Sequence, residues 1–267
     1  MARRTATTRA ACALGAALLS ALTFCASARA QTVPPNEALS PLSKACQAGS
    51  AMIDEQSPLP KVTAALKQRK VLRILSMGAA PGRVGARGDY TDVIESMLES
   101  VLKGVDVVII NRGVSGELAG AAALRMRNEV ALDEPDLVLW QVGTNDALAY
   151  VPVAEFTTTV KKQIAWLKAH KVDLVLVGLQ FAPQMRRDTH YVAVRDALRK
   201  LAAEEKVIII RFYEATQMLT QAAGGAPAPI SVEFERSEAG YNCLAQYVAR
   251  AITLGLFAKS MPKRPAP

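Results

Sequence analysis

The residues best placed to do chemistry follow a buried, strand-like segment near the middle of the chain. Residues 136–142 form a nearly continuous apolar run that stops at Gly143-Thr-Asn-Asp146. A short run rich in Val and Leu is typical of a strand buried on both faces of a parallel sheet. Ligands of open α/β sheets bind outside the carboxyl ends of the strands, so we expect Asn145 and Asp146 to face that crevice. The simpler alternative is a strand-to-helix turn with a side-chain cap.

Two other strand-like segments end in loops of glycine and small residues. Residues 71–77 are followed by Gly78-Ala-Ala-Pro-Gly82, and residues 105–110 by Asn111-Arg-Gly-Val-Ser-Gly116. The carboxyl ends of parallel strands meet at one edge of a sheet, so we expect the three loops to lie side by side.

Strands and helices alternate along the chain. Alternation of this kind predicts a parallel sheet covered by helices on both faces, which is a three-layer α/β/α sandwich. We expect five strands, at 71–77, 105–110, 136–142, 172–177 and 207–210, and helices at 61–70, 90–103, 117–130, 153–170, 188–204, 213–223 and 237–258.

The order, residue types and spacing of the three loops resemble the SGNH, or GDSL, family of esterases and lipases. The resemblance extends from about Arg73 to the last helix, and Gly240-Tyr-Asn-Cys243 also looks like extracellular bacterial members. It implies a flavodoxin-like fold with a five-stranded parallel sheet, and an activity on carbohydrate or lipid esters. We expect no cofactor and no metal.

The resemblance also implies an oxyanion hole made of three hydrogen-bond donors. In this chain the donors are the backbone N–H of Ala80, the backbone N–H of Gly113 and the side-chain amide of Asn145. Together with a helix N-terminus after Pro81, they favour a carboxylate, an acetyl oxygen or a similar acceptor.

The usual catalytic triad is absent at the positions that the resemblance assigns to it. Ala80 occupies the position of the nucleophilic serine, and a methyl group cannot be activated for attack. Counted back from Gly240, the histidine position falls on Glu235 and the aspartate position on Val232. Removing a triad member leaves about 10³- to 10⁴-fold catalysis over water, which is too little for a useful esterase. We therefore expect a catalytically degenerate member of the family.

Other residues are candidates for a rearranged catalytic set. Ser115 lies in the second loop and His190 follows the fourth strand, so both are expected on the crevice side; their simpler roles are a turn serine and a structural histidine. Glu235 and Asp146 are a possible acid and base pair. We favour an ion pair between Glu235 and an arginine of the same rim, which is Arg112, Arg83 or Arg87.

The ends of the chain differ in character from its middle. Residues 1–30 have a basic start, an apolar stretch and Ala28-Arg29-Ala30, which predict a signal peptide cleaved after Ala30 and a secreted or periplasmic protein. We expect an extended, proline-rich arm at 31–60, one SGNH hydrolase-like domain at 61–260 and a tail at 261–267. Without the leader the net charge falls from +8 to +4, too little to indicate a nucleic-acid partner.

Only Cys46 and Cys243 remain after the predicted cleavage. In an oxidising compartment we expect them to form a disulfide, the alternative being two free thiols. The first functional hypothesis is that the protein binds an acylated or anionic ligand, such as a glycan ester, or a protein partner. In this hypothesis the mature protein is not inserted in a membrane. The second is an active ester hydrolase with a rearranged set such as Ser115 with His190 or Glu235. Nothing in the sequence indicates the oligomeric state.

Overall fold

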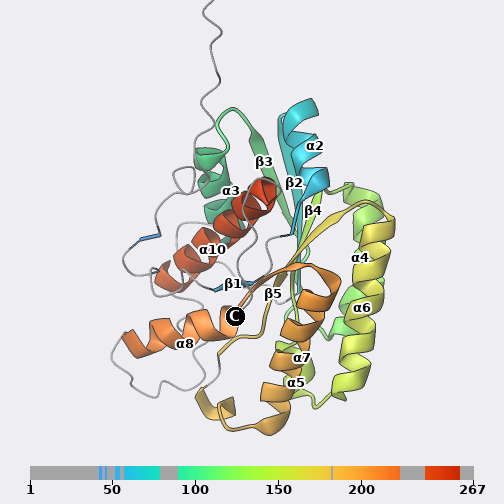
Figure 1. Cartoon of the computed structure of the whole chain (residues 1–267), viewed down its shortest axis with the longest axis vertical. Helices are drawn as coiled ribbons and strands as arrows, with labels where there is room; N and C mark the ends of the chain where they lie inside the picture. Colours follow the sequence, from blue (N-terminus) through green and yellow to red (C-terminus); the bar gives the residue numbers. More distant parts are fainter. Residues whose placement is uncertain are drawn as a thin grey trace, which may run out of the picture. The chain divides into compact units, whose positions relative to one another are not determined.

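The alternating pattern forms a sheet between two layers of helices (Figure 1) in a computed structural model that describes residues 42–43, 46, 52–54, 57–78, 90–181, 183–222 and 238–258. Within these residues, six strands form one sheet in the order β1-β6-β5-β4-β2-β3. Their bounds are Ile53–Asp54 for β1, Val71–Gly78 for β2, Asp106–Asn111 for β3, Leu137–Gln141 for β4, Asp173–Val177 for β5 and Ile208–Ile210 for β6.

Five of these six strands are parallel, which confirms the predicted fold class. Numbered among themselves they run 2-1-3-4-5, the flavodoxin-like order, with the switch point between β2 and β4. The sixth strand, β1, was not predicted. It pairs antiparallel with β6 through Ile53 and Asp54 and adds an edge to the expected five-stranded sheet.

The helices divide into two layers because alternate strand residues point to opposite faces. In β5, Val175 and Val177 pack with the layer that contains α3, α8 and α10, whereas Leu174 and Leu176 pack with α4, α6 and α7 (Figure 1). The bounds are α2 Pro60–Gln68, α3 Tyr90–Val101, α4 Ala119–Asp133, α5 Thr144–Leu148, α6 Val153–Ala169, η3 Pro183–Met185, α7 Thr189–Glu205, α8 Phe212–Ala222 and α10 Glu238–Phe257.

The segment before α2 is attached to α10. Cys46 and Cys243 form a disulfide, with Cα atoms 5.3 Å apart. The Tyr247 hydroxyl donates to the carbonyl oxygen of Cys46 at 2.9 Å, and the backbone N–H of Ser43 donates to the side chain of Gln246 at 2.8 Å. Residues distant in sequence are therefore held together by a disulfide and by hydrogen bonds that include these two.

The other edge of the sheet, β3, is protected by its own helix. The backbone N–H groups of Val107 and Ile109 donate to the carboxylates of Glu99 and Glu95, which lie one turn apart on α3. An open edge strand is a template for pairing with another chain, and filling its donors with carboxylates makes such pairing unfavourable. Within the described residues, side chains of α3 and not a further strand thus protect this edge.

Candidate functional site

The structure brings the ends of β2, β3 and β4 together at the carboxyl edge of the sheet. Ser76 of β2 pairs with Asn111 of β3, and Gly78 pairs with Gln141 of β4. The backbone N–H of Val114 donates to the carbonyl oxygen of Gly78 at 2.8 Å, which joins the second loop to the first. The strand ends therefore lie where the sequence predicted them.

Gly78 fixes the direction in which the chain leaves β2. Its φ is +102°, and a Cβ atom placed on it would lie 1.8 Å from the carbonyl oxygen of Gln141. No other residue fits here, because both the conformation and the close approach of β4 require a missing side chain. The residue two positions later, Ala80, lies outside the described residues, and so do Val232 and Glu235.

Gly113 follows β3 and is half-buried. Its backbone N–H donates to the side-chain oxygen of Asn111 at 3.0 Å. This donor was predicted for the oxyanion hole, and here it closes a local turn. A ligand oxygen at Gly113 must therefore share this N–H with Asn111 or displace the Asn111 side chain.

Asn145 lies in the first turn of α5, a five-residue helix that was expected only as a turn. Gly143 precedes it with a φ of +103°, and a Cβ there would meet the Leu179 side chain at 2.6 Å. The Asn145 amide nitrogen donates to the carbonyl oxygen of Glu117 at 3.0 Å. An amide nitrogen carries two hydrogens, so the Glu117 bond orients the side chain and leaves a second hydrogen for a ligand.

Asp146 does not face the crevice, and this prediction was wrong. Its side chain is 2% exposed, and both carboxylate oxygens accept the backbone N–H of Ala119, at 3.0 and 3.2 Å. Burial raises the pKa of the Asp146 carboxyl, and the Ala119 hydrogen bonds partly offset that rise. Asp146 therefore caps the start of α4 and is not available to pair with Glu235 as an acid or base.

Arg112, expected on the crevice rim, points toward α4. Its guanidinium forms ion pairs with Glu129 at 3.0 Å and Asp133 at 3.2 Å. The Asp133 carboxylate, by hydrogen bonding and charge, raises the pKa of Arg112. Of the three arginines proposed as partners of Glu235, Arg112 is therefore already paired, and Arg83 and Arg87 lie outside the described residues.

Ser115 is exposed, and its hydroxyl forms no hydrogen bond with another of the described residues. A nucleophile needs a base within about 3.2 Å of its hydroxyl, either directly or through one water. Ser115 is therefore a loop serine that forms no hydrogen bond with a base among the described residues.

His190 lies in the first turn of α7 and stacks on Tyr150, with ring centroids 5.1 Å apart. The Tyr150 hydroxyl donates to Asp188 at 2.6 Å, and the other oxygen of Asp188 accepts the backbone N–H of Tyr191 at 2.7 Å. These bonds lower the pKa of the Asp188 carboxyl. The Nε2 atom of His190 is buried and has no hydrogen-bond partner among the residues that the structure describes.

The cluster of Tyr150, Asp188 and His190 was not anticipated as a unit. Asp188 sits at the predicted start of a helix, and an aspartate there is a common N-cap, so its capping role was visible in the sequence. Its contact with Tyr150, which is 38 residues away, left no local signal.

A cavity of about 380 Å³ adjoins the Glu117 segment to which Asn145 bonds. Its walls come from the start of α4, from α6 and from Val151, and the apolar side chains among them are Leu118, Val151 and Phe156. Three acidic residues are among its lining, Glu117, Glu155 and the buried α4 cap Asp146.

The described residues contain neither a candidate membrane-spanning helix nor a candidate metal-binding cluster. No helix among them is long and apolar enough to cross a bilayer. No group of three or more histidine, cysteine, aspartate or glutamate side chains among them is arranged to hold a metal ion.

The fold defines a class of protein. A lipase/acylhydrolase from Enterococcus faecalis superimposes with a TM-score of 0.55 at 20% identity, covering 68% of this chain and 95% of that one. A catalytic mutant of an acetylxylan esterase from Geobacillus stearothermophilus gives 0.54 at 19% identity, covering 68% and 94%. The chain thus has the α/β fold of SGNH hydrolases.

The chain belongs to the Non-GDSL lipase-like family, which matches residues 45–257. It is 29% identical over 113 residues to an arylesterase from Vibrio mimicus, covering 41% of this chain and 54% of the relative. It is 25% identical over 131 residues to the esterase TesA from Pseudomonas aeruginosa, covering 47% and 64%. In each case the match spans less than two thirds of the relative.

Proposed function

We propose that this chain is an extracytoplasmic member of its family that has lost ordinary ester hydrolysis and binds an acylated or anionic ligand at the carboxyl edge of the sheet. One observation carries the proposal. Ala80 replaces the nucleophile and no histidine follows His190 in the sequence, whereas the amide of Asn145 is held in place with one hydrogen to spare. The description of the family as non-GDSL agrees with Gly78-Ala-Ala80.

The location of the two histidines supports the loss of a catalytic base. His170 follows α6, stacks on Trp166 at a centroid distance of 3.9 Å and directs Nδ1 to the carbonyl oxygen of Trp166. It therefore precedes β5, at the amino edge of the sheet. His190 is the single histidine on the carboxyl side, and the base position of the family falls on Glu235.

The ligand class follows from the donors and from the adjoining cavity. An amide N–H and a backbone N–H favour an oxygen acceptor, such as an acyl carbonyl or a carboxylate. Leu118 and Val151 offer apolar surface for a short acyl group. The relatives named as an arylesterase and an esterase agree with an ester or an acid as the ligand class.

The compartment rests on two features. The disulfide between Cys46 and Cys243 is of a kind that persists in oxidising compartments. The predicted signal peptide at residues 1–30 indicates the same location.

Binding at Asn145 is testable with butyrate, which carries a carboxylate and a short acyl chain. Titration of the ¹⁵N-labelled protein is expected to shift the Gly113 amide and the Asn145 side-chain signals. Asn145→Ala is expected to weaken binding about tenfold, because it removes one donor to a charged acceptor. Asn128→Ala, an exposed asparagine on α4, is the matched control and leaves binding unchanged. Butyrate shifts confined to other regions would contradict the proposal.

A second candidate is an active ester hydrolase with a rearranged catalytic set. One observation favours it: within the described part of the chain, the Nε2 atom of His190 is buried and has no hydrogen-bond partner, as expected of a general base before substrate binds. The Ser115 hydroxyl has no hydrogen bond to a base among the described residues, which argues against an active hydrolase. Ester turnover that is abolished by His190→Ala, and also by Ser115→Ala, would replace the first proposal with this one.

A further inference from the structure

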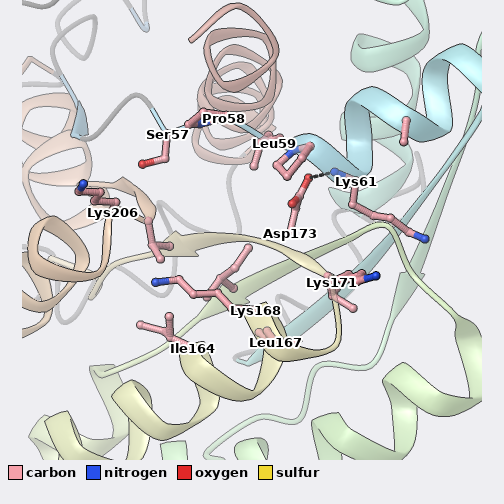
Figure 2. A pocket seen from close by; sticks show the side chains of 15 residues that line it. Ser57, Pro58, Leu59, Lys61, Ile164, Leu167, Lys168, Lys171, Asp173 and Lys206 are labelled. Atoms are coloured by element: carbon pink, nitrogen blue, oxygen red, sulfur yellow. Dashed lines mark hydrogen bonds between the residues drawn. The ribbon is translucent and has the colours of Figure 1, made fainter. Parts of the chain in front are cut away.

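A larger cavity lies at the amino edge of the sheet, where the parallel strands begin. It has a volume of about 490 Å³ and is bounded by the start of α2, the end of α6, the start of β5 and the turn between α7 and β6 (Figure 2). These elements lie at the end of the sheet where α2 is found, away from α5 and η3 (Figure 1). The cavity is therefore separate from the site around Asn145.

The interior of this cavity is mainly hydrocarbon. Of its apolar lining residues, Leu59, Ile164 and Leu167 belong to the buried core and are at most 3% exposed, whereas Pro58, Pro60 and Ala64 are exposed or half-buried. Figure 2 shows Pro58 and Leu59 on one side of the opening, with Ile164 and Leu167 from α6 on the other. The volume lies within the range of about 300 to 1,000 Å³ that is usual for small-molecule sites, and its walls favour an apolar chain.

Four lysines stand around the opening. Figure 2 shows Lys168 and Lys206 on one side of it and Lys61 and Lys171 on the other. Lys168 pairs with Glu205 at 3.0 Å. In the part of the chain that the structure describes, the other three have no carboxylate within ion-pair distance.

The single acidic side chain in the lining does not neutralise these charges. Both backbone N–H groups at the start of α2, those of Lys61 and Val62, donate to one carboxylate oxygen of Asp173 at 2.9 Å. The bond to Lys61 is the dashed line in Figure 2. Asp173 is thus occupied in capping α2, and the opening keeps an excess of positive charge.

Helix electrostatics explain only part of this arrangement. Lys168 lies in the last turn of α6, and Lys171 and Lys206 follow the ends of α6 and α7, where a cation is favourable. Lys61 lies in the first turn of α2, where a cation is unfavourable. The dipole of each helix also gives no reason for lysines from three helix ends to converge on one apolar cavity.

We propose that this cavity binds a medium-chain fatty acid, with its hydrocarbon chain against Pro58, Pro60 and Ala64 and its carboxylate near a lysine of the rim. The chain requires apolar walls and the carboxylate requires a cation, and both are among the residues that line the cavity. The inference is independent of the proposed function at Asn145, because the two sites use different residues at opposite edges of the sheet.

Calorimetric titration of the purified protein with decanoate, below its micelle concentration, tests the proposal. Decanoate is expected to bind with a Kd of about 10 to 100 µM, as its number of non-hydrogen atoms allows. Decanol, which has the chain without the charge, is expected to bind at least about fivefold more weakly. Acetate, which has the charge without the chain, is expected not to bind at millimolar concentration. Equal affinity for decanol and decanoate would overturn the role of the lysines.

Two matched pairs of variants locate the site. Ala64→Phe fills the cavity from the half-buried face of α2 and is expected to abolish decanoate binding; Ala131→Phe, at an exposed alanine of α4, leaves it intact. Lys171→Gln with Lys206→Gln is expected to weaken binding about three- to tenfold. Lys70→Gln removes one charge from a lysine with a similar positive φ, outside the cavity, and is expected to change affinity less than twofold.

The outcomes are distinguishable from those of the butyrate experiment. Asn145→Ala is expected to leave decanoate binding unchanged. Decanoate affinity that falls with Asn145→Ala and survives Ala64→Phe would place the fatty acid at the carboxyl edge and overturn the inference. Binding to vesicles of anionic phospholipid by a protein that does not bind decanoate would overturn it too.

Discussion

A helix at the amino edge and a helix at the carboxyl edge of the sheet are capped in the same way, although their surroundings differ. Both α2 and α4 begin after a leucine, Leu59 and Leu118, which cannot cap a helix. In each case a carboxylate from another element accepts the first N–H groups: Asp173 of β5 for α2, and Asp146 of α5 for α4. A carboxylate near a strand end is therefore not evidence of catalysis, because helix capping uses the same residue in the same place.

The edges differ in what surrounds the cap. At the carboxyl edge the backbone is tightly constrained by Gly78 and Gly143, both with φ above +100°, and the polar groups are mostly paired. At the amino edge Lys171 and Lys206 follow the ends of α6 and α7 with φ of +57° and +52°, and three of the four lysines around the apolar cavity have no carboxylate partner among the described residues. The carboxyl edge thus combines a constrained backbone with mostly paired polar groups, whereas the amino edge offers positive charge and volume.

The largest expected effect comes from Gly78→Ala. The new Cβ would lie 1.8 Å from the carbonyl oxygen of Gln141, on a backbone with a φ of +102°. We expect a loss of at least about 4 kcal/mol in the free energy of unfolding, or no folded protein. Chemical denaturation measures it. Gly104→Ala, with a φ of +74° and nothing within 4 Å, is the control, with an expected loss of about 1 kcal/mol.

A similar loss in both glycine variants would show that conformation, and not the approach of β4, determines the requirement at Gly78. In that case the close approach of β4 would not constrain the backbone of the carboxyl edge.

Removing the buried cap of α4 is expected to have a smaller effect. Asp146→Ala leaves the backbone N–H of Ala119 without an acceptor inside the protein, which costs about 2 kcal/mol of unfolding free energy. Asp146→Asn keeps one side-chain oxygen and is expected to lose about half as much. Urea denaturation of both variants measures these losses. An Asp146→Ala variant as stable as the parent would refute the capping role, and Asp146 would again be a candidate site residue.

The cap of α2 is expected to reveal itself through pH. Burial raises the pKa of the Asp173 carboxyl from 3.8 to about 6, and the nearby Asp136 carboxylate adds to the rise, against the N–H groups of Val62 and Lys61. The folded state then binds more protons than the unfolded state between about pH 4 and pH 6, so the unfolding free energy falls as pH rises through this window.

Asp173→Asn is expected to flatten this dependence, by about 1 to 2 kcal/mol between pH 4 and pH 6, because asparagine does not titrate and keeps an acceptor for α2. Thermal unfolding across this pH range measures the difference. Asp106→Asn, at the exposed start of β3, is the matched control and is expected to leave the slope unchanged. An Asp173→Asn curve parallel to that of the parent would contradict the assignment.

Much of the fold was predictable because its signals are local. The apolar runs of β2 and β4 and the loops that end them marked the sheet, its carboxyl edge and the glycines that turn the chain. The short strand β1 has two residues and no alternation to detect. The role of Asp146 was missed because the helix that it caps begins 27 residues earlier in the chain, and no periodicity reports such a contact.

The candidate site was less predictable than the fold for the same reason. Asn145 was placed correctly near the strand ends, but its partner is a backbone carbonyl of Glu117, which has no side-chain signature. The turn between Asn111 and Gly113, and the pairing of Arg112 with α4, also depend on tertiary contacts. The assignments of Ala80, Val232 and Glu235 to triad positions stay predictions from the sequence.

Hydrolysis of short-chain p-nitrophenyl esters by the purified protein tests the central claim most directly. The parent is compared with a triple variant carrying Ala80→Ser, Val232→Asp and Glu235→His. We expect no turnover by the parent above a control lacking protein, and ester hydrolysis by the triple variant. Rapid turnover by the parent that is lost in Ser115→Ala or His190→Ala would contradict it, because the chain would then be an esterase with a rearranged catalytic set.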